Sequence, residues 1–139
     1  MHFESHRFFR TAGDTGYSNP MIAIIDDDES VRVALQNCAE SYDLSALIYA
    51  SAEEFLAAHP QPGLTCIVTD IQMPGMGGLA LHAHLKRTGS TIPIVFITAF
   101  ADEAIERVAL ESGVAGFFTK PFSADALMQR LWTLSAAKR

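Results

Sequence analysis

Five polar side chains stand where short apolar runs of this sequence stop. Asp26 and Asp27 follow MIAII, Asp70 follows CIVT, Thr98 follows IVFI, and Lys120 follows GFFT. Carboxylates that gather at one place need a cation to neutralise them, and oxygen-only ligands suit a hard ion. A carboxylate can also attack phosphorus, a reaction that asks mainly for positioning and for counter-charges. These residue types therefore indicate metal-assisted phosphoryl transfer onto a side chain.

Asp70 is the candidate nucleophile, and the predicted product is an aspartyl phosphate. It ends an apolar run and precedes the loop IQMPGMGG, a pattern by which a buried parallel strand delivers a reactive side chain to the edge of a sheet. The Lys120 ammonium and the Thr98 hydroxyl would hold phosphoryl oxygens. The predicted ligands of Mg²⁺, or of Mn²⁺ in its place, are Asp27, Asp70, Asp26 directly or through a water, and the backbone carbonyl of Gln72.

The elements that must position these side chains alternate along the chain. Each of five apolar runs is followed by a segment whose apolar residues recur at helical spacing. Strands are predicted at Met21–Ile25, 45–50, 66–69, 92–97 and 115–119. Five strand-helix repeats with short connections predict one α/β domain, with a parallel sheet covered on both faces by right-handed crossovers. In such a sheet the ligand site forms beyond the carboxyl ends of the strands, where all five polar residues fall.

Local signals mark the limits of several elements. Ser51 can cap a helix while Glu54 reaches back to the amide of the capping residue. Pro93 cannot donate to a strand ladder, so it should lie at the entry of its strand. Gly89 and Gly113 are expected to end two of the helices.

Composition limits the classes of partner and location. The 139 residues are 49% hydrophobic, enough for one core, and we expect residues 21–139 to form the domain and residues 1–20 an extension. The net charge of -6 with only 10 Lys and Arg argues against direct nucleic-acid binding. No apolar run approaches a membrane span, and residues 1–20 lack the apolar core of a signal peptide. Cys38 and Cys66 lie within apolar patterns, which predicts buried free thiols and a cytoplasmic location.

Taken in order, four segments resemble the receiver domain of two-component response regulators. They are IIDDDES, VTDIQMPGMGG, FITA and FFTKPF, and the resemblance runs from Met21 to about the C-terminus. It implies a flavodoxin-like sheet in the order 2-1-3-4-5 and transfer of a phosphoryl group from a sensor histidine kinase to Asp70. Such a domain is not an enzyme beyond its own phosphorylation and dephosphorylation. The resemblance also implies a cis bond before Pro121.

The resemblance further implies a switch. Phosphorylation would draw in Thr98, and Phe117 would turn inward, which remodels the face made by the helix around 105–109, the strand 115–119 and the last helix. A homodimer through this face is expected on the same ground. The segments SAEEFL and FFTKPF are similar in sequence to those of receivers that precede a helix-turn-helix output domain. The chain stops soon after the last predicted helix, so no output domain is expected in it, and both a single-domain regulator and an isolated receiver stay open.

Two other functions compete with this interpretation. The first is a small Mg²⁺-dependent phosphohydrolase with Asp26 as nucleophile in a D-x-D arrangement with Asp28, although that leaves Asp70 unexplained. The second is a degenerate receiver that binds partners without phosphorylation. Asp28 is also well explained as an acidic residue at a helix start. His82 and His84, two residues apart, cannot share a helix face as metal ligands.

Overall fold

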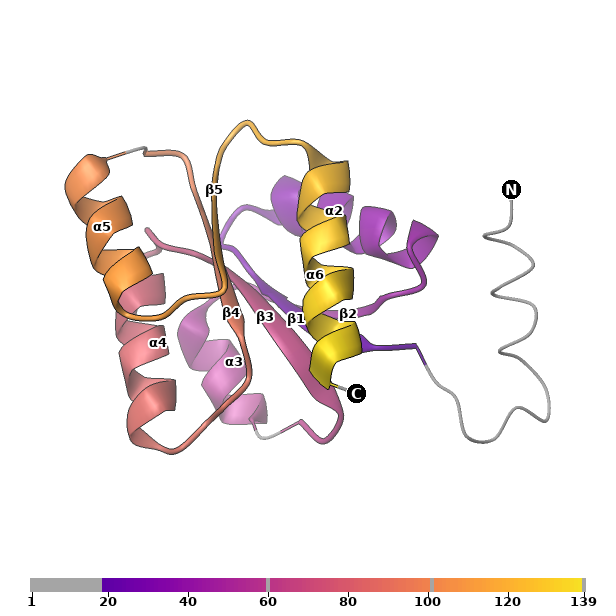
Figure 1. Ribbon diagram of the computed structural model, residues 1–139, viewed down its shortest axis with the longest axis horizontal. Coiled ribbons are helices and arrows are strands. Elements are labelled where there is room, and N and C mark those ends of the chain that lie inside the picture. Colours follow the sequence, from indigo (N-terminus) through magenta and orange to yellow (C-terminus); the bar gives the residue numbers. More distant parts are fainter. Residues whose placement is uncertain (1–18, 60, 101, 139) are drawn as a thin grey trace.

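The computed structural model describes residues 19–59, 61–100 and 102–138 (Figure 1). The extension predicted for residues 1–20 therefore lies almost wholly outside the described residues. Strands and helices alternate throughout the described chain. In order they are β1 (Met21–Ile25), α2 (Glu29–Ser41), β2 (Ser45–Tyr49), α3 (Ala52–Ala58), β3 (Leu64–Asp70), α4 (Gly78–Arg87), β4 (Ile94–Thr98), α5 (Glu103–Glu111), β5 (Gly116–Thr119) and α6 (Ala124–Lys138).

The strands form one parallel sheet in the order β2-β1-β3-β4-β5, which confirms the predicted α/β fold and strand order. Ile24 of β1 lies between Ile48 of β2 and Val68 of β3. All seven residues of β3 are buried, so this strand is the centre of the sheet. The chain order reverses between β1 and β3, and in parallel sheets such a switch leaves room for a site at the carboxyl ends. Asp26 directly follows β1, and Asp70 is the last residue of β3.

β1 has the predicted limits, and each of the other strands differs from its prediction by one or two residues at one end or both. β3 begins at Leu64, because Thr65 occupies an irregularity in the pairing with β1 and its hydroxyl donates to the Met21 carbonyl at 3.1 Å. β4 begins at Ile94, directly after Pro93, which confirms that the proline lies at the strand entry. Pro93 has no N–H to donate, but its carbonyl accepts the Ile67 amide at 3.0 Å. Backbone pairing with β3 therefore includes this residue.

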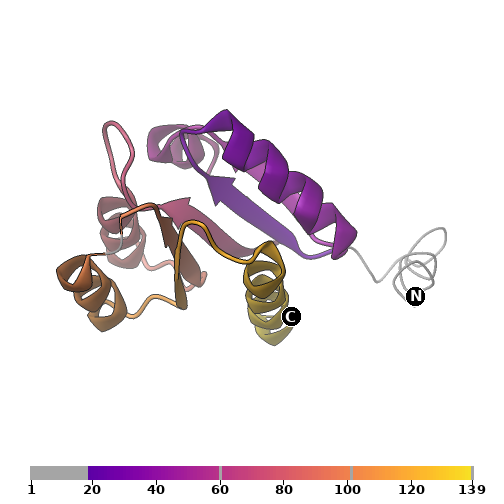
Figure 2. The ribbon, with the colours of Figure 1, turned by 90° about the horizontal axis from the view of Figure 1, so that it is seen from above.

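Side chains that alternate along the strands pack into two apolar layers, one between each face of the sheet and the helices that cover it (Figures 1 and 2). The layer under α3, α4 and α5 includes Ala23, Phe55, Ile67, Leu81, Phe96 and Ala109. The layer under α2 and α6 includes Ile24, Leu35, Val68, Val95, Leu127 and Leu131. Period-two alternation along buried strands and the helical period of the covering segments together place each residue in its layer. Helices therefore cover both faces of the sheet, and both apolar layers help to position its polar strand ends.

The helix limits follow the predicted capping signals. Ser51 caps α3 by accepting the Glu54 amide at 3.0 Å, and Glu54 accepts the Ala50 amide at 2.8 Å. The predicted Ser51 cap is confirmed, whereas the prediction that Glu54 accepts the Ser51 amide is wrong, because the donor is the Ala50 amide one residue earlier. α4 and α5 give way to Gly89 and Gly113, whose φ angles of 87° and 90° suit glycine.

The two cysteines are free, with Cys66 buried and Cys38 half-buried. Burial raises the pKa of the Cys66 thiol to about 12, so it is inert at neutral pH. A search of residues 19–59, 61–100 and 102–138 finds no helix with the length and apolar character of a membrane span.

Candidate functional site

The acidic run after β1 divides into three side chains with different surroundings. Asp26 is completely buried, and its Oδ1 accepts the Asp28 amide at 2.9 Å. Asp27 is exposed. The Asp28 carboxylate is engaged as the N-cap of α2, where it accepts the Ser30 amide at 2.9 Å and the Ser30 hydroxyl at 2.7 Å. The helix-start interpretation of Asp28 agrees with these contacts, which leave Asp26 and Asp27 to face the site.

Asp70 and Lys120 meet across the switch point of the sheet. Asp70 is buried at the end of β3, and its Oδ1 accepts the Gln72 amide at 2.9 Å. Its Oδ2 accepts the Lys120 ammonium at 2.9 Å. The same ammonium lies 3.0 Å from Oδ2 of Asp26. One ammonium therefore bridges two carboxylates at the ends of neighbouring strands, whose residues lie 50 and 94 positions before Lys120 in the sequence.

Burial and charge act in opposite directions on this cluster. Burial raises the pKa of the Asp26 carboxyl above its ordinary value, and the hydrogen bonds from the Asp28 amide and the Lys120 ammonium offset this only in part. Burial by itself would lower the pKa of Lys120, but its hydrogen bonds to Asp70 and Asp26 outweigh burial and the pKa is raised. Lys120 is thus held in its charged form.

Three carboxylates come close enough to share a metal ion. Asp26, Asp27 and Asp70 each offer an oxygen atom, and these atoms all lie within 4.8 Å of one another. The single Lys120 ammonium cannot neutralise three carboxylates. A cluster with excess negative charge and only oxygen donors fits a hard divalent cation.

The other predicted site residues lie on the two neighbouring strands. Thr98 is buried at the end of β4, where its hydroxyl oxygen accepts the Phe100 amide at 3.1 Å. Its backbone carbonyl accepts the Lys120 amide at 2.7 Å, which brings the ends of β4 and β5 together. Phe117 pairs with Phe96 in the sheet and is half-buried against the layer under α5. The Lys120-Pro121 bond is cis, as the resemblance implies.

Two neighbours of the cluster were not identified from the sequence. The Arg32 guanidinium of α2 donates to the Asp26 carbonyl at 2.8 Å. The Glu53 carboxylate of α3 accepts the Met76 amide, in the loop after Asp70, at 2.9 Å. Arg32 lies six residues beyond the carbonyl that it binds, and Glu53 lies 23 residues before its partner amide. Neither spacing follows a helix or strand period, so no local pattern marks them.

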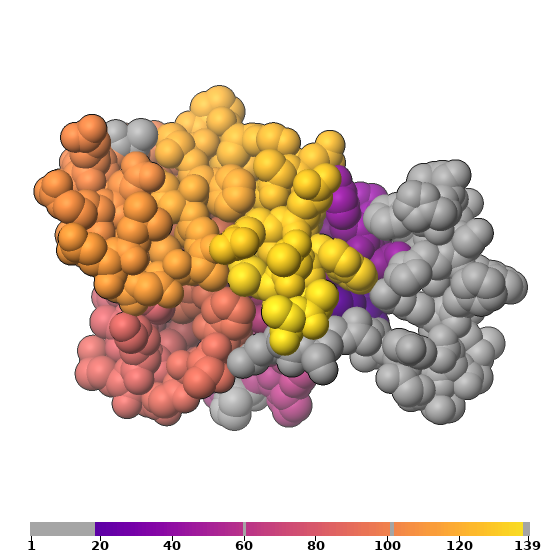
Figure 3. All heavy atoms as spheres, in the orientation of Figure 1, coloured from indigo at the N-terminus to yellow at the C-terminus, as the bar shows by residue number. Residues whose placement is uncertain are grey.

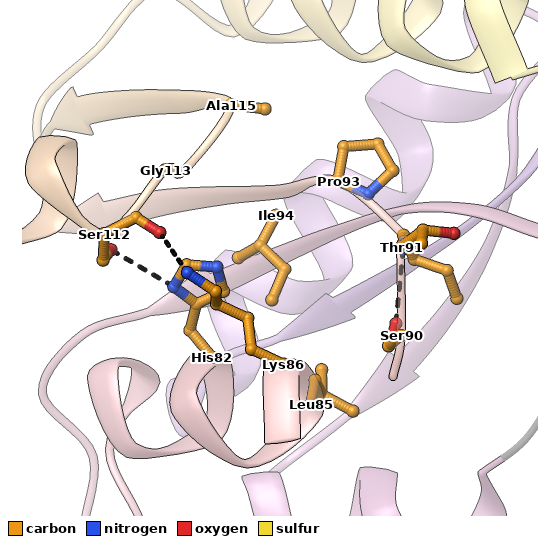
Figure 4. Close-up of a pocket in the computed structure, with 11 residues that line it drawn as sticks. His82, Leu85, Lys86, Ser90, Thr91, Pro93, Ile94, Ser112, Gly113 and Ala115 are labelled. Atoms are coloured by element: carbon orange, nitrogen blue, oxygen red, sulfur yellow. Dashed lines mark hydrogen bonds between the residues drawn. The ribbon is translucent and has the colours of Figure 1, made fainter. Parts of the chain in front are cut away.

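A cavity at the opposite, amino end of the sheet has a different character (Figure 4). It has a volume of about 320 Å³ and lies between α4, the entry of β4 and the end of α5. His82 lines it, buried, with Nδ1 3.3 Å from the Ser112 hydroxyl, and the Lys86 ammonium donates to the Ser112 carbonyl at 3.0 Å. None of the predicted site residues lines this cavity.

The family follows from the comparison with known proteins. Residues 22–132 match the family model of the response regulator receiver domain. The chain belongs to this family. TodT of Pseudomonas putida, a response regulator protein, is 37% identical over 108 residues, which cover 78% of this chain and 48% of TodT. FixJ of Azorhizobium caulinodans, a transcriptional regulatory protein, is 36% identical over 107 residues, which cover 77% of this chain and 51% of FixJ.

Solved receiver structures share the fold. The crystal structure of FixJ-N superposes with a TM-score of 0.78 at 29% identity, covering 86% of this chain and 96% of that chain. The response regulator StyR superposes with a TM-score of 0.78 at 34% identity, covering 87% of this chain and 61% of StyR. The predicted family and fold are confirmed. The chain spans about half the length of the response regulators TodT and FixJ that it matches.

Proposed function

We propose that this receiver domain accepts a phosphoryl group on Asp70 from a sensor histidine kinase. The observation that carries the proposal is the Lys120 ammonium, which bridges Asp26 and Asp70 at 3.0 and 2.9 Å beside a third carboxylate, Asp27. Asp70 is presented at a strand end, and its charge is balanced by a cation that can also meet a phosphoryl oxygen. Family membership supports the kinase as donor.

The donor set fits Mg²⁺ or Mn²⁺. Asp26, Asp27 and Asp70 would hold the ion, with the backbone carbonyl of Gln72 as a further ligand. When bound, the ion supplies positive charge to the transferring phosphoryl oxygens. The Gln72 amide already bonds one Asp70 oxygen, which fixes the carboxylate plane from the side of the loop.

The transfer forms one bond and breaks one. A carboxylate oxygen of Asp70 attacks phosphorus, the bond between phosphorus and the histidine nitrogen breaks, and the imidazole leaves with the bonding electron pair. Lys120 stays protonated and exchanges part of its contact with Asp70 for a phosphoryl oxygen. The Thr98 hydroxyl donates to the Phe100 carbonyl only over 3.5 Å, so its proton is available to another phosphoryl oxygen.

The proposal extends to the signalling face, which is made by α5, β5 and α6. These elements adjoin one another in Figures 1 and 3, and the end of β5 is tied to Thr98 through the Lys120 amide. Movement of Thr98 toward a phosphoryl group would open space beside β5 for the Phe117 ring. Phe117 lacks a hydroxyl, so its inward and outward positions would differ in packing alone. A homodimer would form through this face.

The domain limits and the cellular setting belong to the same proposal. We assign residues 21–139 to the receiver domain and residues 1–20 to an extension, in line with the family match over 22–132. A cytoplasmic location is supported by the two free thiols. In this proposal the domain catalyses only its own phosphorylation and dephosphorylation.

Intact-mass measurement after incubation with acetyl phosphate tests the proposal. The native chain should gain one phosphoryl group when Mg²⁺ is present and none with EDTA, and Asp70→Asn should gain none. Borohydride reduction followed by peptide mapping then locates the acyl phosphate. A label on Asp26 would replace the receiver mechanism with the phosphohydrolase alternative. No label in the native chain, with Mg²⁺ bound, would indicate a receiver that acts only by binding.

A further inference from the structure

The loop between β3 and α4, residues 71–77, connects the phosphoacceptor to the next helix and is anchored at both ends by backbone contacts. The Ile71 amide donates to the Ile97 carbonyl at 3.0 Å, and the Gly78 amide donates to the Ile71 carbonyl at 2.9 Å. A Cβ on Gly77 would lie 2.7 Å from the Ile71 carbonyl oxygen, so the chain closes on itself without space for a side chain. These contacts hold the ends of the loop but leave its tip to other interactions.

The tip of the loop is shaped around the carboxylate of Glu53. Oε2 of Glu53 accepts the Met76 amide at 2.9 Å. The same oxygen lies 2.6 Å from the position that a Cβ on Gly75 would occupy, and Gly75 has a φ of 77°. The positive φ favours glycine, and a Cβ at this position would displace the Glu53 carboxylate. The hydrogen bond from Met76 also lowers the pKa of Glu53, so the acceptor stays ionised at neutral pH.

We infer that Glu53 is a positioning residue for the acidic site, which holds the loop after Asp70 in one arrangement and thereby raises the affinity of the site for a divalent cation. The inference rests on the proposed function, because it deepens the role of the same site. The loop carries the Gln72 amide that orients Asp70 and the Gln72 carbonyl proposed as a ligand. Glu53 touches neither, so it acts through the backbone between residues 72 and 76.

The adjacent Glu54 provides a matched control. It lies in the same first turn of α3, is also exposed, and also accepts one backbone amide, that of Ala50, at 2.8 Å. Its bond stays within the capping box and does not reach the loop. Substitution of Glu54 by alanine therefore removes the same charge and a comparable hydrogen bond, but it leaves the bond between Glu53 and the loop in place.

The test is a Mg²⁺ titration of the isotope-labelled chain by NMR, with hydrogen exchange of the Met76 amide as a second readout. Glu53→Ala should weaken Mg²⁺ binding roughly three- to tenfold, the scale of one charge-assisted hydrogen bond at an exposed position. It should also speed exchange of the Met76 amide by at least about tenfold, because the amide loses its partner. Glu53→Gln keeps an oxygen acceptor, so it should fall between the native chain and Glu53→Ala. Glu54→Ala should stay within about twofold of native for Mg²⁺.

Each other outcome decides against the inference or against the proposed function. Equal weakening of Mg²⁺ binding by Glu53→Ala and Glu54→Ala would assign the effect to charge or helix stability, and unchanged binding in Glu53→Ala would overturn the inference directly. A native chain that binds Mg²⁺ but gains no phosphoryl group would overturn the proposed function while leaving this comparison valid. A native chain that binds no Mg²⁺ would overturn both.

Discussion

The two ends of the sheet are built in opposite ways. At the carboxyl end, Asp26, Asp70 and Lys120 contact one another directly, and the backbone packs so closely that a Cβ on Gly78 would lie 2.6 Å from the Asp70 carbonyl oxygen. At the amino end, a cavity of about 320 Å³ lies between α4, the entry of β4 and the end of α5, and His82 lines it (Figure 4). The charged chemistry lies at the carboxyl end, where a pocket of about 410 Å³ is lined by Lys120 and by residues of α2, whereas no carboxylate is among the described residues that line the cavity at the amino end.

The contrast bears on the reaction proposed for Asp70. An enzyme that acts on a separate small molecule needs a concave pocket that encloses it. A domain that modifies its own carboxylate needs only a nucleophile and counter-charges at a place that a phosphodonor can reach. The N-terminus of α2 adds a favourable field, since the amide of its N-cap residue Asp28 donates to the Asp26 carboxylate at 2.9 Å. The cavity at the amino end, which none of the predicted site residues lines, is therefore not required for such a reaction.

The largest expected effect compares one lysine from each end. Lys120→Met should slow labelling by acetyl phosphate at least about 100-fold, because the ammonium that bridges Asp26 and Asp70 is lost. Lys86→Met should change the rate by less than about twofold, because Lys86 contacts a carbonyl beside the cavity, remote from the cluster. The measurement is the initial rate by intact mass. Equal slowing by the two variants would remove the functional contrast between the ends.

The next effect compares one glycine from each end. Gly78→Ala should lower the free energy of unfolding by about 3 kcal/mol, because its Cβ would meet the Asp70 carbonyl oxygen and the Ile71 Cα, both backbone atoms. Gly113→Ala should cost only about 1 to 2 kcal/mol, from its φ of 90° alone, since no atom lies within 4 Å of the added carbon. Urea unfolding gives both values. Equal losses would mean that packing at the two ends is alike.

Much of this contrast could be predicted from the sequence, and the reasons are local. Asp70, Thr98 and Lys120 each end an apolar run, so a parallel sheet must bring them to one edge. The strand order and the cis bond before Pro121 came from resemblance to a family, because no periodicity encodes them. The contact of Lys120 with both carboxylates depends on a turn conformation after β5, which only the structure specifies.

The contacts that escaped prediction join segments through loops. Glu53 was recognisable as an acidic residue in the first turn of α3, but its bond to Met76 depends on the path of a loop with no repeating pattern. The cavity was equally hidden, since it is lined by α4, the entry of β4 and the segment after α5, which are separate in the sequence. Sequence therefore predicts which residues reach a sheet edge, and much less well how neighbouring loops support them.

The smallest expected effect concerns how each end of the sheet shifts the pKa of a basic side chain. Lys120 is kept charged by two carboxylates, whereas no carboxylate is among the described residues that line the cavity around His82. Burial lowers the pKa of His82 from 6.5, and the nearby Lys86 ammonium lowers it further. The folded state therefore binds fewer protons than the unfolded state as pH falls through 6.5, so this part of the stability is present at higher pH and is lost on acidification.

Urea midpoints at pH 7.5 and 5.5 measure this contribution. The native chain should lose more stability between the two values than His82→Gln, in which the buried imidazole is replaced by a side chain that does not titrate. His84→Gln removes one imidazole from the same helix outside the cavity, so it should keep the native pH dependence. If His82→Gln and the native chain lose the same stability between the two pH values, burial does not disfavour the charged form of His82. The two ends of the sheet would then differ in packing and in chemistry, but not in their effect on the protonation of a side chain.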